Sequence, residues 1–138
     1  MKYAITLLPD PRGGYTVTFP DVPEAITEGD TLEEAVRHAS ETLEAALSFY
    51  LDANKEIPKP VAKGAHMVGP PALSQAKIFL YRTMHQAGVT KAKLARRLGW
   101  SKTQVGRLLD LNHDSRLDQV EAALAVLGKR LDVRVIAA

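Results

Sequence analysis

The segment from Lys91 to Asp110 restricts the fold more strongly than any other part of the chain. Two helices can cross near a right angle around a short turn only if certain positions hold small or apolar residues. Ala95 is small enough for a second helix to pack on it, and Gly99 can adopt the left-handed conformation that ends a first helix. Ser101 can cap the second helix by accepting a backbone hydrogen bond. The spacing predicts a helix-turn-helix. Its core is expected to contain Leu94, Leu98, Trp100, Val105 and Leu108.

Lysine residues lie at the start of both predicted helices. Lys91 and Lys93 fall in the first turn of one helix, and Lys102 begins the next. A cation at this positive end costs about a few tenths of a kcal/mol against the helix dipole. The cost is more easily tolerated where a phosphate binds, because helix N-termini bind anions. The pattern favours a DNA-binding motif, and a helical hairpin without a nucleic-acid ligand is the alternative.

The second helix is predicted to be a recognition helix in the major groove of double-stranded DNA. Lys102 or Arg107 can pair with guanine and Gln104 with adenine, while Thr103 can contact a thymine methyl group. The first helix is better placed for phosphates, which position a protein without reading sequence. The predicted DNA-binding residues are Thr90, Lys91, Lys93, Arg97, Ser101, Lys102, Thr103, Gln104 and Arg107.

The charge of the chain is divided between its two halves. Residues 1–70 hold six Lys and Arg against eleven Asp and Glu, a net charge of −5. Residues 71–138 hold twelve Lys and Arg against five Asp and Glu, a net charge of +7. Such asymmetry indicates two modules with partners of opposite charge. The basic half suits a phosphate backbone, and the acidic half suits a basic protein. Two solvated surfaces of different composition are the simpler alternative.

The first half has the pattern of a small sheet followed by one long helix. Alternating aromatic and β-branched residues predict strands over Tyr3–Leu7 and Tyr15–Phe19, joined by a turn rich in proline and glycine. A third short strand is predicted over Ala25–Glu28. The helix is expected to start at Thr31, because Thr31-Leu32-Glu33-Glu34 fits a capping box. This β-β-β-α module is an antiparallel sheet covered on one face. The helix should bury Leu32, Val36, Ala39, Leu43, Leu47 and Tyr50.

The second half is predicted to be helical until a terminal strand. Helices are expected over Ala72–Ala87, Thr90–Leu98 and Ser101–Asp110. A further helix should start at the capping box Ser115-Arg116-Leu117-Asp118 and bury Leu117, Val120, Leu124 and Leu127. Apolar residues alternate over Leu131–Ile136, which predicts a strand that pairs with residues 66–68 of the same chain or of a second copy.

The predicted fold class is α+β, in three parts. Residues 58–71 hold four of the eight prolines and two glycines, a composition typical of linkers. We therefore predict a β-β-β-α domain over 1–58, a linker over 59–71 and a helix-turn-helix domain over 72–138. A single helix-turn-helix covers one half-site of an operator, so we expect a homodimer or higher homo-oligomer.

The composition argues against several other classes of protein. The chain has no cysteine, which excludes disulfides, thiolate zinc sites and cysteine nucleophiles and favours the cytoplasm. No apolar run approaches the roughly 20 residues that cross a bilayer, so no membrane is expected as a partner. The apolar stretch at the N-terminus is too short for a secretory signal.

An enzyme is a weaker hypothesis. A nuclease would need clustered carboxylates that hold two metal ions. The candidates Asp10, Asp21, Glu24 and Asp30 lie in predicted turns, where solvated acids are the simpler interpretation. The four histidines have no ligand spacing. We therefore predict no catalytic residue, no metal and no cofactor.

Several segments resemble the HicB antitoxin family, in the subgroup with a helix-turn-helix. Those in the first half are Phe19–Ala25, Thr27–Ala35 and Ile57–Pro60, and those in the second are Leu80–Arg82, Leu94–Gly99 and Leu117–Glu121. The resemblance implies a partial ribonuclease-H-like fold for the first domain. One departure from the family pattern is Glu24-Ala25, where many members have Gly-Cys, so contacts at this turn should not be copied from them.

The resemblance also implies a type II toxin–antitoxin function. The first domain would bind and block HicA, a small basic toxin that cleaves mRNA, and the second would repress the operon by binding its operator. A stand-alone DNA-binding repressor with a ligand-sensing first domain is the alternative. A short open reading frame beside the gene would distinguish the two.

Overall fold

The computed structural model describes residues 1–137, and its first part contains the strands predicted from the alternating pattern. The first strand is interrupted at Ile5, so it forms two segments. The five strands are β1 (Tyr3–Ala4), β2 (Thr6–Pro9), β3 (Tyr15–Thr18), β4 (Ile26–Gly29) and β5 (Met67–Val68). Strands β2, β3 and β4 form an antiparallel sheet in that order, and β1 pairs separately with β5, also antiparallel.

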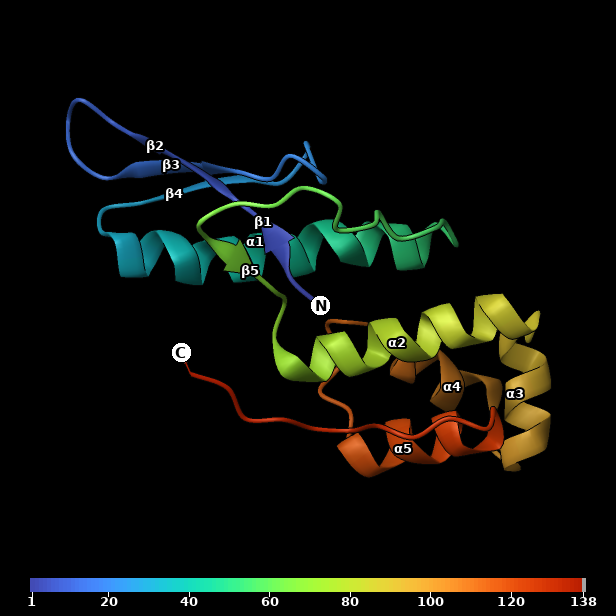
Figure 1. Cartoon of the computed structure of the whole chain (residues 1–138). Helices are drawn as coiled ribbons and strands as arrows, with labels where there is room; N and C mark the ends of the chain where they lie inside the picture. Colours follow the sequence, from blue (N-terminus) through green and yellow to red (C-terminus); the bar gives the residue numbers. More distant parts are fainter. Residues whose placement is uncertain (138) are drawn as a thin grey trace. The chain divides into compact units, whose positions relative to one another are not determined.

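Helix α1 (Leu32–Asp52) packs against β3 and β4 (Figure 1). The register aligns Val17 with Leu7 and with Thr27, which places these side chains on one face of the sheet, and Val17 is fully buried. The close approach of α1 to the sheet requires Gly29, because a Cβ atom there would lie 2.4 Å from the backbone nitrogen of Ala35.

The start of α1 agrees with the prediction, and its buried face is shifted. The Thr31 hydroxyl caps the helix by accepting a hydrogen bond from the backbone N–H of Glu34. Leu32 is exposed, and Val36 and Tyr50 are half-buried, contrary to the prediction, because the helix turns its smaller alanines toward the sheet. The buried residues are Ala35, Ala39, Leu43, Ala46, Leu47 and Leu51.

The chain divides into two compact units, Met1–Gln75 and the part from Ala76 onward. Residues 59–71, predicted to be a linker, belong to the first unit, where they contain β5 and form several hydrogen bonds with residues 1–58. Asp21 accepts a hydrogen bond from the backbone N–H of Ala62 (2.9 Å), and Ser40 donates one to the carbonyl of Gly69 (2.8 Å). Just before this segment, the Tyr3 hydroxyl donates to the carbonyl of Pro58 (2.6 Å).

The second unit is helical. Helix α2 (Ala72–Ala87) has the predicted bounds and is followed by Gly88 in a left-handed conformation. Then follow α3 (Lys91–Leu98), α4 (Lys102–Leu108) and α5 (Leu117–Val126). The core of this unit includes Ile78, Leu80, Met84, Leu94, Val105, Leu108, Val120, Ala123 and Leu124. No helix within residues 1–137 is long and apolar enough to cross a membrane. The antiparallel strands of the first unit and the helices of the second confirm the predicted α+β class.

Two predictions for the second half are wrong. Within the single chain no strand forms over Leu131–Ile136, because β5, the predicted partner within the chain, pairs with β1 instead. Ser115 does not cap α5: the N-cap is Arg116, without a side-chain hydrogen bond, and the Ser115 hydroxyl binds the carbonyl of Arg107 instead. Leu117 is consequently exposed and Leu127 only half-buried.

Candidate nucleic-acid interface

The turn between α3 and α4 has the conformation that the sequence predicts. Thr90 caps α3 by accepting a hydrogen bond from the N–H of Lys93 (3.2 Å). Gly99 ends α3 with φ of 70°, in the left-handed region, and the N–H of Trp100 then donates to the carbonyl of Ala95 (3.0 Å). The chain thus reverses direction over a few residues, which brings α4 against α3.

A small apolar core holds the two helices together. Leu94, Val105 and Leu108 are buried, and the buried Ala95 leaves room for the second helix. Leu98 and Trp100, which were also predicted to belong to this core, are only half-buried. The arrangement confirms the small residue and the glycine turn, and it places the outer surface of α4 in solvent.

The N-terminus of α4 is closed by a reciprocal pair of hydrogen bonds. The Ser101 hydroxyl accepts from the N–H of Gln104 (3.1 Å), and the Gln104 side-chain oxygen accepts from the N–H of Ser101 (2.8 Å). An amide reads adenine with both its oxygen and its nitrogen. Gln104 would therefore have to leave this capping box to make that contact in full.

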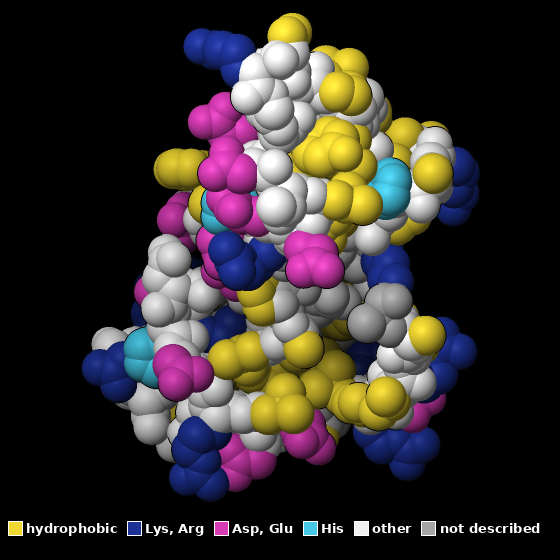
Figure 2. Space-filling view, turned by 90° about the vertical axis from the view of Figure 1, so that its left-hand side faces the viewer, with side chains coloured by type: hydrophobic (Ala, Val, Ile, Leu, Met, Phe, Trp, Pro, Cys, Tyr) yellow, Lys and Arg dark blue, Asp and Glu magenta, His cyan; other side chains and the backbone are white. Residues whose placement is uncertain are grey.

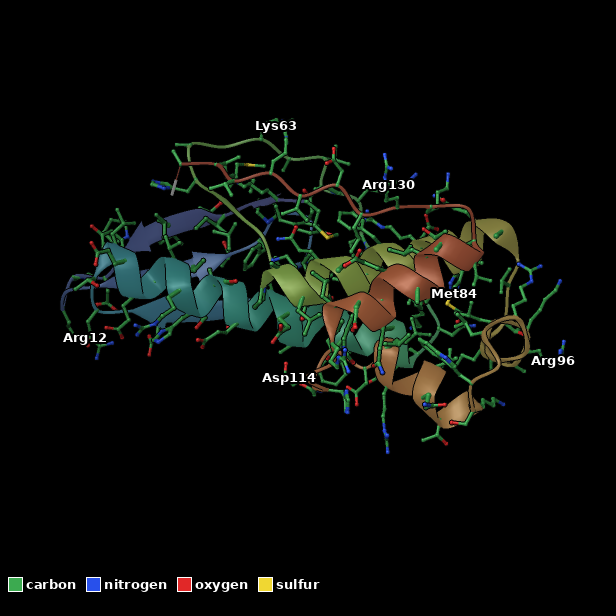
Figure 3. All side chains as sticks on the ribbon, turned by 90° about the horizontal axis from the view of Figure 1, so that it is seen from below. Arg12, Lys63, Met84, Arg96, Asp114 and Arg130 are labelled. Atoms are coloured by element: carbon green, nitrogen blue, oxygen red, sulfur yellow. The ribbon has the colours of Figure 1, made fainter. Side chains whose placement is uncertain are left out.

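All nine predicted DNA-binding residues are exposed on or beside α3 and α4. Among residues 1–137, none of their basic side chains forms an ion pair, so their charges are free to meet phosphates. Arg96 was not among the nine, but its side chain is also exposed and points away from the ribbon in Figure 3. The basic residues among the nine are Lys91, Lys93, Arg97, Lys102 and Arg107.

Lys77 on α2 is the residue of this unit that the sequence pattern did not reveal. Its side chain is fully buried, and its ammonium group donates hydrogen bonds to backbone carbonyls at the end of α4 and in the loop that follows. Helical periodicity could have shown that position 77 faces inward, beside the buried Ala76 and Leu80. The acceptors lie 30 or more residues further along the chain, where local spacing gives no signal.

Three of the acids considered as metal ligands, Asp10, Asp21 and Glu24, accept hydrogen bonds within the first unit. Asp10 accepts a hydrogen bond from the N–H of Arg12 (2.8 Å) in the β2–β3 turn, and Asp21 accepts one from the N–H of Ala62. Glu24 accepts a hydrogen bond from the Tyr50 hydroxyl, and this bond, together with desolvation, raises the pKa of Tyr50 above its usual value. Within residues 1–137, no three histidine, aspartate or glutamate side chains gather as metal ligands would.

The first unit also exposes large apolar side chains among its acids. Ile26 is 60% exposed on β4 and Phe49 is 72% exposed on α1, and Leu8 on β2 lies on the same open face of the sheet as Ile26. Figure 2 shows acidic side chains beside hydrophobic ones on the first unit, in the upper part of the view. Exposed apolar groups of this size, close to charged ones, are typical of protein-binding surfaces.

Comparison with known proteins shows the class of protein to which this two-unit chain belongs, the antitoxins of bacterial toxin–antitoxin systems. The family model of the HicB-like antitoxins matches residues 2–79. The chain therefore belongs to the HicB-like antitoxin family.

Relatives of the same kind match almost the whole chain. Antitoxin HicB of Escherichia coli K12 is 38% identical, with 99% of this chain and 100% of the relative covered. Antitoxin HicB 2 of Photorhabdus laumondii is 40% identical over 99% of this chain and 97% of its own length. Antitoxin HicB of Pseudomonas fluorescens is 41% identical over 99% of this chain and 95% of its own length. The similarity thus extends through the second unit, beyond the residues that the family model matches.

Two glycines test the backbone of this interface. A Cβ atom at Gly99 or at Gly106 would meet nothing within 4 Å, but only Gly99 has a positive φ. Gly99→Ala should therefore destabilise the second unit by about 1–2 kcal/mol, the cost of a left-handed residue. Gly106→Ala, inside α4, should stabilise it by about 0.5–1 kcal/mol. Urea unfolding followed by the fluorescence of Trp100 would measure both, and equal effects would contradict the assigned turn.

Proposed function

We propose that the chain is an antitoxin with two activities. Its first unit binds and neutralises a small basic toxin of the HicA type that cleaves mRNA. Its second unit contains a helix-turn-helix that binds operator DNA and represses the chain's own operon. Both activities belong to the cytoplasm, where the mRNA and the promoter lie. The family membership supports the antitoxin role, and the opposite charges of the two units support two different partners.

The observation that carries the DNA-binding proposal is the exposed, unpaired basic surface of α3 and α4. Lys102 and Arg107 lie on α4, the helix that we assign to the major groove, and have no acidic partner among residues 1–137. Lys91 and Lys93 lie in the first turn of α3, where backbone N–H groups also favour a phosphate. In this proposal, the residues of α4 read the bases, and the lysines of α3 bind the phosphates of the DNA backbone.

Changing Lys102 or Arg107 to Ala should weaken binding to the promoter duplex by about 1–3 kcal/mol for each lost base contact. Lys91→Ala and Lys93→Ala should instead weaken binding to all duplexes about equally and reduce the salt dependence, because they remove phosphate contacts. Fluorescence anisotropy with promoter and shuffled duplexes at several salt concentrations would separate the two effects. Promoter affinity unchanged in both α4 variants would show that α4 is not the recognition helix.

The toxin-binding proposal rests on the acidic first unit and its exposed apolar side chains. Residues 1–70 carry a net charge of −5, which complements a basic protein. Ile26 supplies apolar area beside Glu28 on the open face of the sheet, and Phe49 supplies apolar area beside Asp52 on α1, and all four residues are exposed. Aromatic anchors surrounded by charged residues commonly provide much of the binding energy of an interface.

Co-expression with a HicA-type toxin tests the toxin-binding activity. The wild-type chain should restore growth. A fragment over 1–75 should also restore growth, because it keeps the whole first unit, including the pairing of β5 with β1. It should not bind DNA, because it lacks α3 and α4. In the full chain, Phe49→Ala should weaken toxin binding by at least about 1 kcal/mol. The variant carrying both Lys102→Ala and Arg107→Ala is the control and should still rescue growth. A folded fragment that does not bind the toxin would place the interface elsewhere.

The segment after α5 supports a further proposal, that the chain acts as a homodimer or a larger homo-oligomer. Val133 is 76% and Val135 is 98% exposed, although the alternating pattern of this segment is that of a half-buried strand. Pairing with the same segment of a second copy would cover both side chains. A two-fold pair would also present two recognition helices to half-sites roughly 34 Å apart.

A chain shortened to end at Gly128 should therefore form smaller particles than the full chain in multi-angle light scattering. Val133→Lys combined with Val135→Lys should have the same effect, because charges on this face oppose pairing. Asp132→Asn with Arg134→Gln is the matched control on the opposite face and should leave the particle mass unchanged. Persistence of the full-length mass in the folded, shortened chain would remove the segment from the assembly.

A further inference from the structure

Lys77 is a charged residue of α2 whose side chain is 0% exposed. Its Nζ atom donates hydrogen bonds to the carbonyl oxygens of Arg107 (3.1 Å), Asp110 (2.7 Å) and His113 (2.5 Å). All four residues belong to the second unit. One buried cation therefore joins the long helix α2 both to the last turn of α4 and to the loop between α4 and α5.

The surroundings of Lys77 suit a cation. The last carbonyls of a helix have no partner within the helix and carry a partial negative charge. An ammonium group has three N–H donors, and here three carbonyls accept from it. An apolar side chain of similar size would fill the same space but would donate no hydrogen bond to these three carbonyls, and losing a buried hydrogen bond from a charged donor is costly. Filling space alone therefore does not explain a lysine at this position, whereas fixing one arrangement of α4 does.

The loop that Lys77 contacts is ordered by further hydrogen bonds. The Ser115 hydroxyl donates to the carbonyl of Arg107 (3.3 Å), the same carbonyl that accepts from Lys77. The Ser115 hydroxyl also lies 3.0 Å from Nδ1 of His113. Asp110 accepts a hydrogen bond from the N–H of Asn112 (2.9 Å). Asp114, labelled in Figure 3, lies in the same loop. The end of α4 is thus held from two side chains, one on α2 and one just before α5.

This contact bears directly on the proposed recognition helix. Helix α4 has seven residues, too few to be stable through its own backbone hydrogen bonds. Its N-terminus is closed by the Ser101–Gln104 capping box, and its C-terminus is held by Lys77. Arg107 links the two roles, because its carbonyl accepts from Lys77 while its side chain is exposed on the predicted DNA surface.

We propose that Lys77 is a positioning residue for sequence-specific DNA binding. It touches no DNA itself, and it fixes the end of α4 so that the exposed side chains meet the base edges in one orientation. The inference rests on the proposed function of the second unit. A binding site needs such support, because small displacements of the residues that make contact reduce complementarity.

The full chain carrying Lys77→Met tests this proposal, and Lys129→Met is the matched control. Lys129 is exposed after α5, so its substitution removes the same charge from the same unit without touching α4. Each variant is titrated with a duplex of the promoter upstream of its own gene and with a shuffled duplex. Measurements are made at a temperature where circular dichroism shows a folded chain.

In Lys77→Met, the ratio of promoter to shuffled affinity should fall about tenfold, the loss expected from one misplaced base contact. Shuffled-duplex affinity should match that of Lys129→Met. A residue with a purely structural role would lower both affinities in proportion to the unfolded fraction. A folded Lys77→Met chain with the ratio of the control would overturn the proposal.

If Lys77→Met does not fold, Ser115→Ala decides the matter, because it removes a weaker, neutral contact to the same carbonyl. The ratio should then fall about threefold, as expected for one hydrogen bond, and an unchanged ratio would overturn the proposal. The chain has no cysteine, so a single Lys77→Cys can be alkylated with 2-bromoethylamine to restore an amine of similar length. Recovery of the ratio in the refolded chain supports the proposal. A wild-type chain without any promoter preference would instead remove the proposed function, and that result needs no variant.

Discussion

The second unit depends on one backbone constraint, the left-handed conformation of Gly99. This residue ends α3 and lets the chain return within a few residues, so that α4 packs on the small side chain of Ala95. Leu94 and Val105 are both buried in this arrangement, and the polar side of α4 is left in solvent. The basic residues gain a common surface through this geometry, although none of them takes part in forming the turn.

Patterns of short range could be predicted from the sequence. The period-2 alternation located β3 and, as a single strand, β1 and β2, and the Thr31 and Ser101 caps located the starts of α1 and α4. These signals depend on residues a few positions apart, whose geometry is fixed by the element itself. The candidate DNA-binding residues are exposed as predicted for the same reason, since helical spacing determines which side of α4 is polar.

Features that depend on distant partners could not be predicted. The alternation after α5 predicted a strand, but a strand also needs a partner, and β5 is occupied by β1. Ser115 fitted a capping box, yet its hydroxyl binds the carbonyl of Arg107, eight residues earlier. Lys77 looked like an ordinary helical lysine because its acceptors lie beyond the reach of any local pattern. In each case the choice between partners is made by tertiary packing.

If α4 reads DNA bases as proposed, the capping box at Ser101 affects how Gln104 would recognise an adenine. As long as Gln104 closes the helix, its side-chain oxygen is occupied by the N–H of Ser101. To read adenine, the amide must exchange one internal hydrogen bond for two external ones, while water takes over the exposed N–H of Ser101. The net gain is therefore smaller than the gain from an amide that is free beforehand. Under the proposed DNA-binding role, Gln104 would therefore discriminate adenine only moderately, and its contact would require a side-chain rearrangement rather than a rigid fit.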